Sequence, residues 1–210
     1  MNFLFNKNIF TFIIYFFLFS FSFCISFNKD YPEKKSFLIE VAPSQESNKP
    51  RSLPSERVIK LRKVNVSNKF SDKSFVYRRS ETKYESDFYN EFLISPQQNI
   101  AEEFIRYLDR SNVFQSATDM SSRIEASHFI EIDVIQLYGD FRDSSKPKSL
   151  IELQIRVFDD READYKPVWR KNYQRAIAMK NETPEALVIG WDSALSEITK
   201  EFISDANNWK

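Results

Sequence analysis

The sequence predicts an α+β domain in which two amphipathic helices pack on one face of a single mixed, largely antiparallel sheet. Between residues 58 and 178, several short segments carry apolar residues at every second position, which is typical of strands with one solvated face. Two longer segments carry apolar residues at helical spacing, and each begins with a hydroxyl residue followed by proline. The order is strands, helix, strands, helix, so one sheet covered by both helices buries every apolar stripe.

Four short strands are expected before the first helix, at residues 36–41, 58–66, 74–79 and 83–88. The second of them is rich in branched residues with cations between them, a composition that favours a strand.

The first helix is expected to begin after Ser95, which is the predicted N-cap, with Pro96 at the first helical position. Gln98 follows three residues after the cap, as in a capping box. The expected buried stripe is Ile100, Ala101, Phe104, Ile105 and Leu108, and the helix is expected to end at Asn112.

Three strands follow at residues 129–138, 150–158 and 168–178, the second with the cleanest alternation. The last helix is expected to begin at Thr183-Pro184 and to run to about residue 207. Its predicted buried stripe is Leu187, Trp191, Ala194, Leu195, Ile198 and Phe202. Gly190 lies within this helix at a cost of about 1 kcal/mol relative to Ala, which indicates close approach to a neighbouring element.

The composition excludes several functions. The chain has 210 residues with 30 basic and 30 acidic side chains, one His, one Cys and two Gly. It therefore lacks the glycines of a phosphate-binding loop, the ligands of a Cys/His zinc site and the partner for an internal disulfide. Zero net charge argues against a nucleic-acid partner. We expect no cofactor, no metal and no catalytic residues.

The N-terminus predicts export from the cytoplasm. Residues 9–27 carry no charge and follow a short start with a single Lys7, so residues 1–24 are a signal peptide or a membrane anchor. Three outcomes stay open: lipidation at Cys24, retention of the apolar run as an anchor, or cleavage at the small residues near Ser22. Phe23 stands where a lipobox has a small residue.

The remainder of the chain divides into a tether and a domain. Residues 25–56 are interpreted as a tether that contains one short strand and a Pro/Ser-rich linker, and residues 57–210 as the domain. The linker is expected to let the domain stand off the membrane.

Few residues have the pattern of a catalytic group. His128 opens a strand with Ser127 before it, and either a general base or a strand-end histidine fits this position. Glu131 and Asp133 lie on one strand face, as a carboxylate pair or as part of a solvated face. The acidic cluster at residues 159–164 is interpreted as a hairpin turn. The aromatic and cationic segment 75–79 fits anionic lipid headgroups, a protein partner or a charged edge strand.

The order of several weak motifs resembles a known family. The motifs are Phe75-Val76-Tyr77-Arg78-Arg79, Tyr84-Glu85-Ser86-Asp87-Phe88-Tyr89-Asn90-Glu91-Phe92, Gly139-Asp140-Phe141-Arg142-Asp143 and Trp191-Asp192-Ser193-Ala194-Leu195. The chain resembles the auxiliary lipoproteins of ABC-type transport systems, which accompany substrate-binding proteins of the mammalian-cell-entry type in lipid traffic between bacterial membranes. The resemblance extends over most of residues 30–202 and implies a mixed α/β fold, an outer-membrane anchor at Cys24 and a non-enzymatic role.

The functional hypothesis is a membrane-tethered, periplasm-facing accessory subunit of an ABC-type lipid or solvent transporter. Tyr77, Arg78, Tyr84, Tyr89 and Phe92 are the predicted partner contacts. Lipid and a second copy of the chain are further predicted partners. Two alternatives stay open: an envelope-assembly lipoprotein that binds lipopolysaccharide or a β-barrel partner, and an exported hydrolase that uses His128.

Overall fold

The computed structural model describes residues 32–41, 55–161, 164 and 166–209. The chain divides into two compact units, Met1–Glu33 and Lys34–Lys210, and the second contains the helices and strands described below. The predicted signal segment, Cys24 and the linker at residues 42–54 lie outside the described residues. In the described part of the chain, none of the helices has the length and apolar character needed to cross a membrane.

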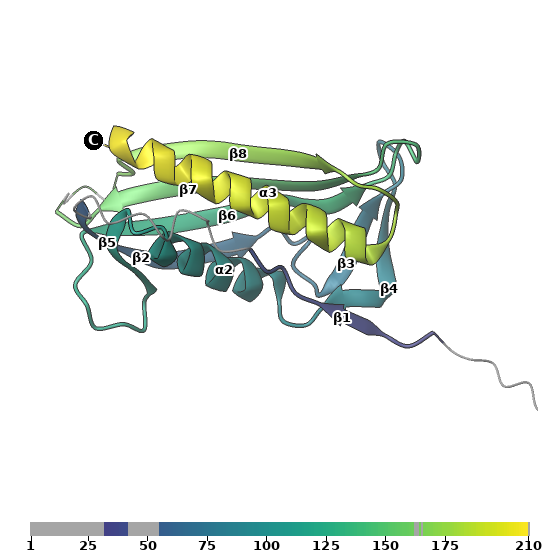
Figure 1. The fold of residues 1–210 in the computed structure, drawn as a ribbon, viewed down its shortest axis with the longest axis horizontal. Helices are drawn as coiled ribbons and strands as arrows, with labels where there is room; N and C mark the ends of the chain where they lie inside the picture. The colour runs from purple at the N-terminus through teal and green to yellow at the C-terminus, as the bar shows by residue number, and fades with distance from the viewer. Residues whose placement is uncertain (1–31, 42–54, 162–163, 165, 210) are drawn as a thin grey trace, which may run out of the picture. The chain divides into compact units, whose positions relative to one another are not determined.

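The α+β class predicted from the sequence is confirmed (Figure 1). The elements are β1 (Lys35–Phe37), β2 (Ser55–Val66), β3 (Ser74–Arg78), β4 (Tyr84–Phe92), α2 (Pro96–Arg110), β5 (Phe114–Asp119), β6 (His128–Asp140), β7 (Lys148–Asp159), β8 (Trp169–Ala178), α3 (Pro184–Asp205) and the short 3-10 helix η2 (Ala206–Asn208). Both predicted helix starts are confirmed, since Ser95 and Thr183 accept hydrogen bonds from the backbone three residues later.

Strand β6 organises a mixed sheet that has eight strands in the described residues. Along one edge, β6 pairs antiparallel with β7 over its whole length, and β7 pairs antiparallel with β8. Two strands share the other edge: β2 pairs parallel with residues 128–134 and β3 pairs parallel with residues 139–140. Beyond them, β5 pairs with β2, whereas β4 and then β1 extend from β3. We call β3, β4 and β1 the β3–β4–β1 wing.

The change from β2 to β3 occurs where β6 is irregular. The register with β7 shifts between Val134 and Gln136, and Ser67 N donates to Val134 O at 2.9 Å just after β2 ends. Residues 67–73 then leave the sheet before the chain returns as β3. One of the alternatives for residues 75–79, a charged edge strand, is excluded, because β3 lies between β4 and β6.

Other strand bounds differ from the expected ones. β5 was not predicted, because its sequence FQSATD is polar and short, and it becomes a strand by pairing with β2. β4 continues to Phe92, beyond the expected end at residue 88. β1 ends at Phe37, although residues 36–41 were expected to be extended.

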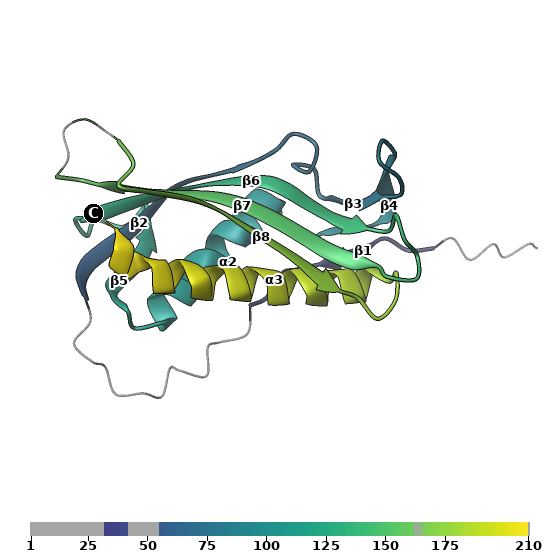
Figure 2. The same ribbon diagram turned by 90° about the horizontal axis from the view of Figure 1, so that it is seen from above.

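Both helices cover the same face of the sheet (Figure 2), as predicted. α2 packs on β2 and β5, whereas α3 packs on β7 and β8. The helices meet where the rings of Phe104 and Phe202 lie 5.4 Å apart. The predicted stripe of α3 is completely buried, and the inward positions of β7 are Ile151, Leu153, Ile155 and Val157, as expected.

Gly190 is the point of closest approach between α3 and the sheet. A Cβ atom at this position would lie 2.4 Å from the Cβ of Ser149 on β7. The neighbouring Trp191 donates from Nε1 to Leu150 O at 3.2 Å. The glycine therefore permits the contact, which confirms its interpretation from the sequence.

Residues 39–41, which follow β1, are held by side chains of the helices. Asn99 pairs with the backbone of Ile39 in both directions: its Oδ1 accepts from Ile39 N at 2.8 Å and its Nδ2 donates to Ile39 O at 2.9 Å. A carboxylate oxygen of Glu103 accepts from Val41 N at 2.8 Å. The side chains of Ile39 and Val41 enter the core. Because these residues belong to no strand, α2 supplies the hydrogen bonds that a strand neighbour would supply.

Helix α3 contributes a third contact to the same segment. Asp192 Oδ1 accepts from Glu40 N at 3.0 Å. Burial raises the pKa of the Asp192 carboxyl to about 6, and the nearby carboxylates of Glu103 and Glu40 act in the same direction. Ionisation of Asp192 therefore costs more free energy in the folded chain than in the unfolded chain.

These contacts correct the expected role of the linker. The compact unit begins at Lys34 rather than at residue 57, because β1 is part of the sheet and residues 39–41 are part of the core. Residues 42–54 therefore join two segments of the same unit. A connection of this kind does not set the distance between the domain and a membrane anchor, which depends on residues before Lys34.

The Gly190→Ala substitution is expected to lower the free energy of unfolding by about 1–3 kcal/mol, because the added methyl group would overpack the contact with Ser149. This loss outweighs the gain of about 1 kcal/mol in helix propensity. Urea denaturation followed by circular dichroism measures it. Lys200→Ala on the exposed side of α3 is the control, and a Gly190→Ala protein as stable as this control would contradict the packing.

The Asp192→Asn substitution is expected to stabilise the protein near pH 8 and to have little effect near pH 4. The folded-state pKa is raised, so the folded chain binds the proton more tightly than the unfolded chain. The stability of the wild type therefore falls as the pH rises from about 4, the pKa of an unperturbed aspartate, through about 6, the pKa of Asp192 in the folded chain. Denaturation of both proteins at several pH values measures the difference. A constant difference, or one equal to that of the exposed Asp72→Asn control, would contradict the interpretation.

Candidate functional site

The predicted partner contacts lie on β3 and β4, and their positions divide between the two faces of the sheet. Ser149 faces α3, so its neighbour Leu150 and the paired Tyr138 face away from the helices. Arg78 approaches the ring of Tyr84, its partner in the register, and the hydroxyl of Tyr138. Arg78 and Tyr84 therefore lie on the face opposite the helices, which we call the outer face.

Arg78 connects the outer face with the turn between β3 and β4. Its guanidinium donates to Glu81 Oε2 at 2.8 Å, to Tyr138 Oη at 3.4 Å and to Ser80 O at 3.3 Å. The same group lies 5.6 Å from the ring centre of Tyr84, which is 44% exposed. The ring of Tyr84 is thus exposed on the outer face, and the partly buried guanidinium of Arg78 lies against it.

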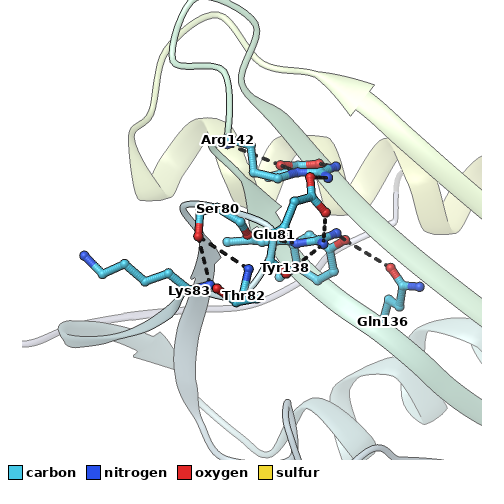
Figure 3. Close-up of polar contacts among 9 residues, drawn as sticks. Ser80, Glu81, Thr82, Lys83, Gln136, Tyr138 and Arg142 are labelled. Carbon is cyan, nitrogen blue, oxygen red and sulfur yellow. Dashed lines mark hydrogen bonds and ion pairs between the residues drawn. The ribbon is translucent and has the colours of Figure 1, made fainter.

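A second arginine joins this network from the connection that follows β6. Arg142 donates to Glu81 Oε1 and to Asp140 Oδ2, both at 2.6 Å (Figure 3). Glu81 therefore bridges two guanidinium groups, and the turn between β3 and β4 is held to the end of β6. Ser80 Oγ completes the turn by accepting from Lys83 N at 3.1 Å.

A hollow of about 210 Å³ lies beside Tyr84. Its lining residues are Lys69, Phe70, Asp72, Ser74, Val76, Tyr84, Glu85 and Ser86. The ring of Phe70 stacks on Tyr138 at 5.7 Å and lies 6.5 Å from Tyr84. Residues 67–73 connect β2 to β3 outside the sheet. They therefore lie over part of the outer face and form one wall of the hollow.

Two of the predicted contacts point into the protein instead, and we correct their assignment. Phe92 is 2% exposed and packs against Phe75 and Trp191 at ring distances of 4.8 and 5.3 Å. Tyr77 is buried with its ring stacked on Phe141 at 5.1 Å. Neither side chain offers a surface to a partner, because both residues are buried.

A bulge in β4 was not predicted, and it exposes aromatic side chains. Ser74 pairs with Glu91 whereas Val76 pairs with Ser86, so β4 carries extra residues between these two pairs. Within this bulge, which we define as residues 87–90, Phe88 is 70% exposed and its ring lies 5.1 Å from that of Tyr89. We call it the aromatic bulge.

The carboxylate of Asp87 holds the aromatic bulge in place. It accepts from Tyr77 Oη at 2.6 Å, from Tyr89 N at 2.8 Å, from Asn90 N at 3.0 Å and from Asn90 Nδ2 at 2.8 Å. Partial burial acts in the opposite direction, yet these hydrogen bonds hold the pKa of Asp87 below its usual range. Burial, reinforced by Asp87, raises the pKa of Tyr77. The bulge is therefore an ordered feature anchored in the wing.

Sequence reasoning included Tyr89 among the partner contacts but missed Phe88 and Asp87. The available signal was the pair of adjacent aromatic residues Phe88-Tyr89, which violates strand alternation, directly after an aspartate that favours local turns. The bulge depends on the pairing of β4 with β3. Alternation counted along the sequence from Tyr84 therefore could not tell on which face of the sheet the residues after Asp87 lie.

His128 is 5% exposed and lies between two polar groups. Its Nδ1 lies 2.9 Å from Ser127 Oγ, and its Nε2 lies 3.9 Å from Asp159 Oδ2. Ser127 Oγ also accepts from Val58 N at 3.0 Å and donates to Val58 O at 3.1 Å. The hydroxyl therefore connects β2 to β6, and burial lowers the pKa of His128.

The remaining acidic candidates are structural in this geometry. Glu131 and Asp133 both bind Arg156, at 3.3 and 2.8 Å, on the solvated side of β6. The antiparallel pairing of β7 with β8 makes the segment between them a hairpin connection, as predicted; Asp159 ends β7, and residues 162–163 of the acidic cluster lie outside the described residues. In the described part of the chain, no group of three or more His, Cys, Asp or Glu residues is placed to hold a metal ion.

Comparisons with known proteins show the fold. No family model matches the sequence, and no curated protein matches it significantly. A Xanthomonas campestris protein of the DUF330 family superposes with a TM-score of 0.65 at 14% identity, covering 81% of this chain and 92% of that one. An uncharacterised protein superposes with a TM-score of 0.65 at 10% identity, covering 82% and 98% of the two chains. At these identities the likeness establishes a shared architecture.

The Asp87→Ala substitution is expected to lower the free energy of unfolding by about 1–3 kcal/mol, because it leaves the buried hydroxyl of Tyr77 without its acceptor. It should also accelerate proteolysis within residues 87–90, whose backbone loses two hydrogen bonds. Urea denaturation and limited proteolysis measure both effects. Ser86→Ala, an exposed change in the same strand, is the control. Unchanged cleavage of the Asp87→Ala protein would show that Asp87 does not hold the bulge.

Proposed function

We propose that the protein is a non-catalytic, membrane-tethered accessory subunit of an ABC-type lipid transport system. In this proposal the compact unit faces the periplasm and docks on the substrate-binding component of the transporter. The proposal rests mainly on Tyr84, whose exposed ring is contacted by Arg78 and borders the hollow on the outer face. An arrangement of this kind serves protein recognition rather than bond chemistry.

The chemistry of the outer face supports a protein partner. Tyrosine and arginine are the residues most enriched among the side chains that dominate binding energy, because they combine large contact area with directional hydrogen bonds. Arg78 and Arg142 are already oriented by Glu81, so little side-chain freedom is lost when a partner binds. The hollow has room for one inserted side chain, flanked by Tyr84 and Phe70.

The geometry around His128 favours a structural role for this residue over a catalytic one. A serine nucleophile needs a hydroxyl that is free to attack and a base that is accessible to substrate. Ser127 Oγ instead makes two hydrogen bonds to the backbone of Val58, and His128 is buried. The arrangement stabilises the β2–β6 pairing.

The transport role rests on the resemblance carried by the motifs of β3, β4 and α3, and the shared architecture with the DUF330 protein is consistent with it. The N-terminal apolar run supplies the attachment, through lipidated Cys24 or as a retained helix. The chain then positions a protein-binding face near the membrane without entering the transport path.

Replacing Tyr84 by a photo-crosslinking phenylalanine analogue tests the docking face in intact envelopes. We expect a crosslinked product that contains the periplasmic substrate-binding component of an ABC-type transporter, because this ring is exposed at the proposed contact. The same analogue at the exposed Ile124, in the connection between β5 and β6, is the matched control and should give none. A product with a β-barrel protein, or equal products at both positions, would contradict the proposal.

A further inference from the structure

The point at which the chain enters the compact unit is fixed. β1 pairs with β4 from Lys35↔Asn90 to Phe37↔Phe92, and residues 39–41 are bound by Asn99, Glu103 and Asp192. The segment that can separate an N-terminal anchor from the domain is therefore limited to residues 25–33 for an anchor at Cys24 and to residues 28–33 for a retained apolar run. Fully extended, this segment spans at most about 25–35 Å before Lys34.

That span is shorter than the domain is wide. A unit of this size has a diameter of about 40 Å, so the end that contains Lys34 is the end nearest to an anchored membrane. The β3–β4–β1 wing lies at the end of the compact unit opposite the C-terminus (Figure 1). With an anchor in the membrane, so short a connection would favour orientations in which this wing faces the bilayer.

The aromatic bulge lies directly beside the point of entry. Lys34 Nζ is 5.1 Å from the ring centre of Phe88 and 3.4 Å from a carboxylate oxygen of Glu91. Leu93, which follows β4 and is 53% exposed, donates from its backbone N to Phe37 O at 2.8 Å. Exposed phenylalanine, tyrosine and leucine side chains therefore surround the first residues of the unit.

The composition of this surface suits the interface of a lipid bilayer. Aromatic rings and aliphatic side chains partition into the headgroup region, where a nearby lysine keeps its charge in water. Of the adjacent cations, Lys34 pairs with Glu91, Lys35 lies 3.7 Å from Glu185, and Lys73 donates to the backbone O of Leu93 at 2.8 Å. Because two of these three cations face a carboxylate, we expect the attraction to be mainly apolar and salt to weaken it little. Asp87 holds the rings outward, so they do not collapse onto the wing.

We propose that the aromatic bulge, with Leu93, is a second membrane contact that inserts into the bilayer surface beside the N-terminal anchor. This inference rests on the anchor in the proposed function. The N-terminal anchor holds the chain at the bilayer, and a second apolar contact adds the burial of its own side chains to this attachment. The contact also leaves the domain in one orientation, with Tyr84 four positions before Phe88 along β4 and free to meet the partner.

The test uses the full-length chain in vesicles of phosphatidylethanolamine and phosphatidylglycerol that contain a phospholipid with a photoactivatable acyl chain. After illumination, mass spectrometry compares labelling of the peptide that contains Phe88 with labelling of the peptide that contains Met120 and Ile124, which are also exposed. We expect at least about ten-fold more label on the bulge, the effect of burying one aromatic side chain. The excess should persist at high salt.

Two variants establish the cause. Phe88→Ser combined with Leu93→Ser should reduce the label on β4 by about ten-fold, and circular dichroism checks that the variant folds. If the double variant does not fold, Phe88→Gln replaces it. This single change at a largely exposed position should also reduce the label on β4. Ile189→Ser, which removes an exposed apolar side chain from α3, is the matched control and should leave the labelling unchanged.

The outcomes separate this inference from the proposed function. If the chain floats with the vesicles but the bulge is labelled no more than residues 120–124, the membrane contact is overturned and the anchor stands. Crosslinks between two copies at Phe88 would assign the bulge to self-association and overturn the inference as well. A chain that does not float with the vesicles would overturn the anchor and, with it, this contact.

Discussion

The division of one edge of β6 between two strands is the constraint on which the rest of the structure depends. β2 uses this edge up to Val134, the register of β6 shifts there, and β3 uses the edge again at Gly139. Because residues 67–73 leave the sheet between these strands, they cover the outer face and form the hollow. The same division makes β3, β4 and β1 a separate wing, in which the docking face and the aromatic bulge both lie.

Polar side chains inside the domain determine where the chain enters this wing. Asn99, Glu103 and Asp192 replace a missing strand neighbour for residues 39–41, and the raised pKa of Asp192 shows that this contact is made at a cost. A carboxylate inside the domain that binds a backbone N–H fixes the position of that backbone more than it adds to the stability of the fold. The consequence is that the compact unit begins at Lys34, before the first strand, and not after residues 42–54.

The candidate site was predictable only in part. Tyr84 and Arg78 lie on the surface or directly support it, because they precede the bulge and strand alternation still holds there. Phe92 and Tyr77 were placed incorrectly, since their aromatic character serves the core as readily as it serves a partner. Phe88 was missed because its exposure depends on the bulge, which exists only in the pairing of β4 with β3, and because one hydrogen bond of Asp87 comes from Tyr77 on β3.

The sequence by itself determined the fold class, the starts of both helices and the inward faces of α3 and β7, because caps and periodic apolar residues are local signals. It also carried the apolar N-terminal run and the close contact expected at Gly190. Only the tertiary structure decided that β5 is a strand, that residues 39–41 belong to the core and that β4 bulges at Asp87. Each of these features depends on a partner distant in sequence, and pairing between distant segments leaves no periodic trace in either of them.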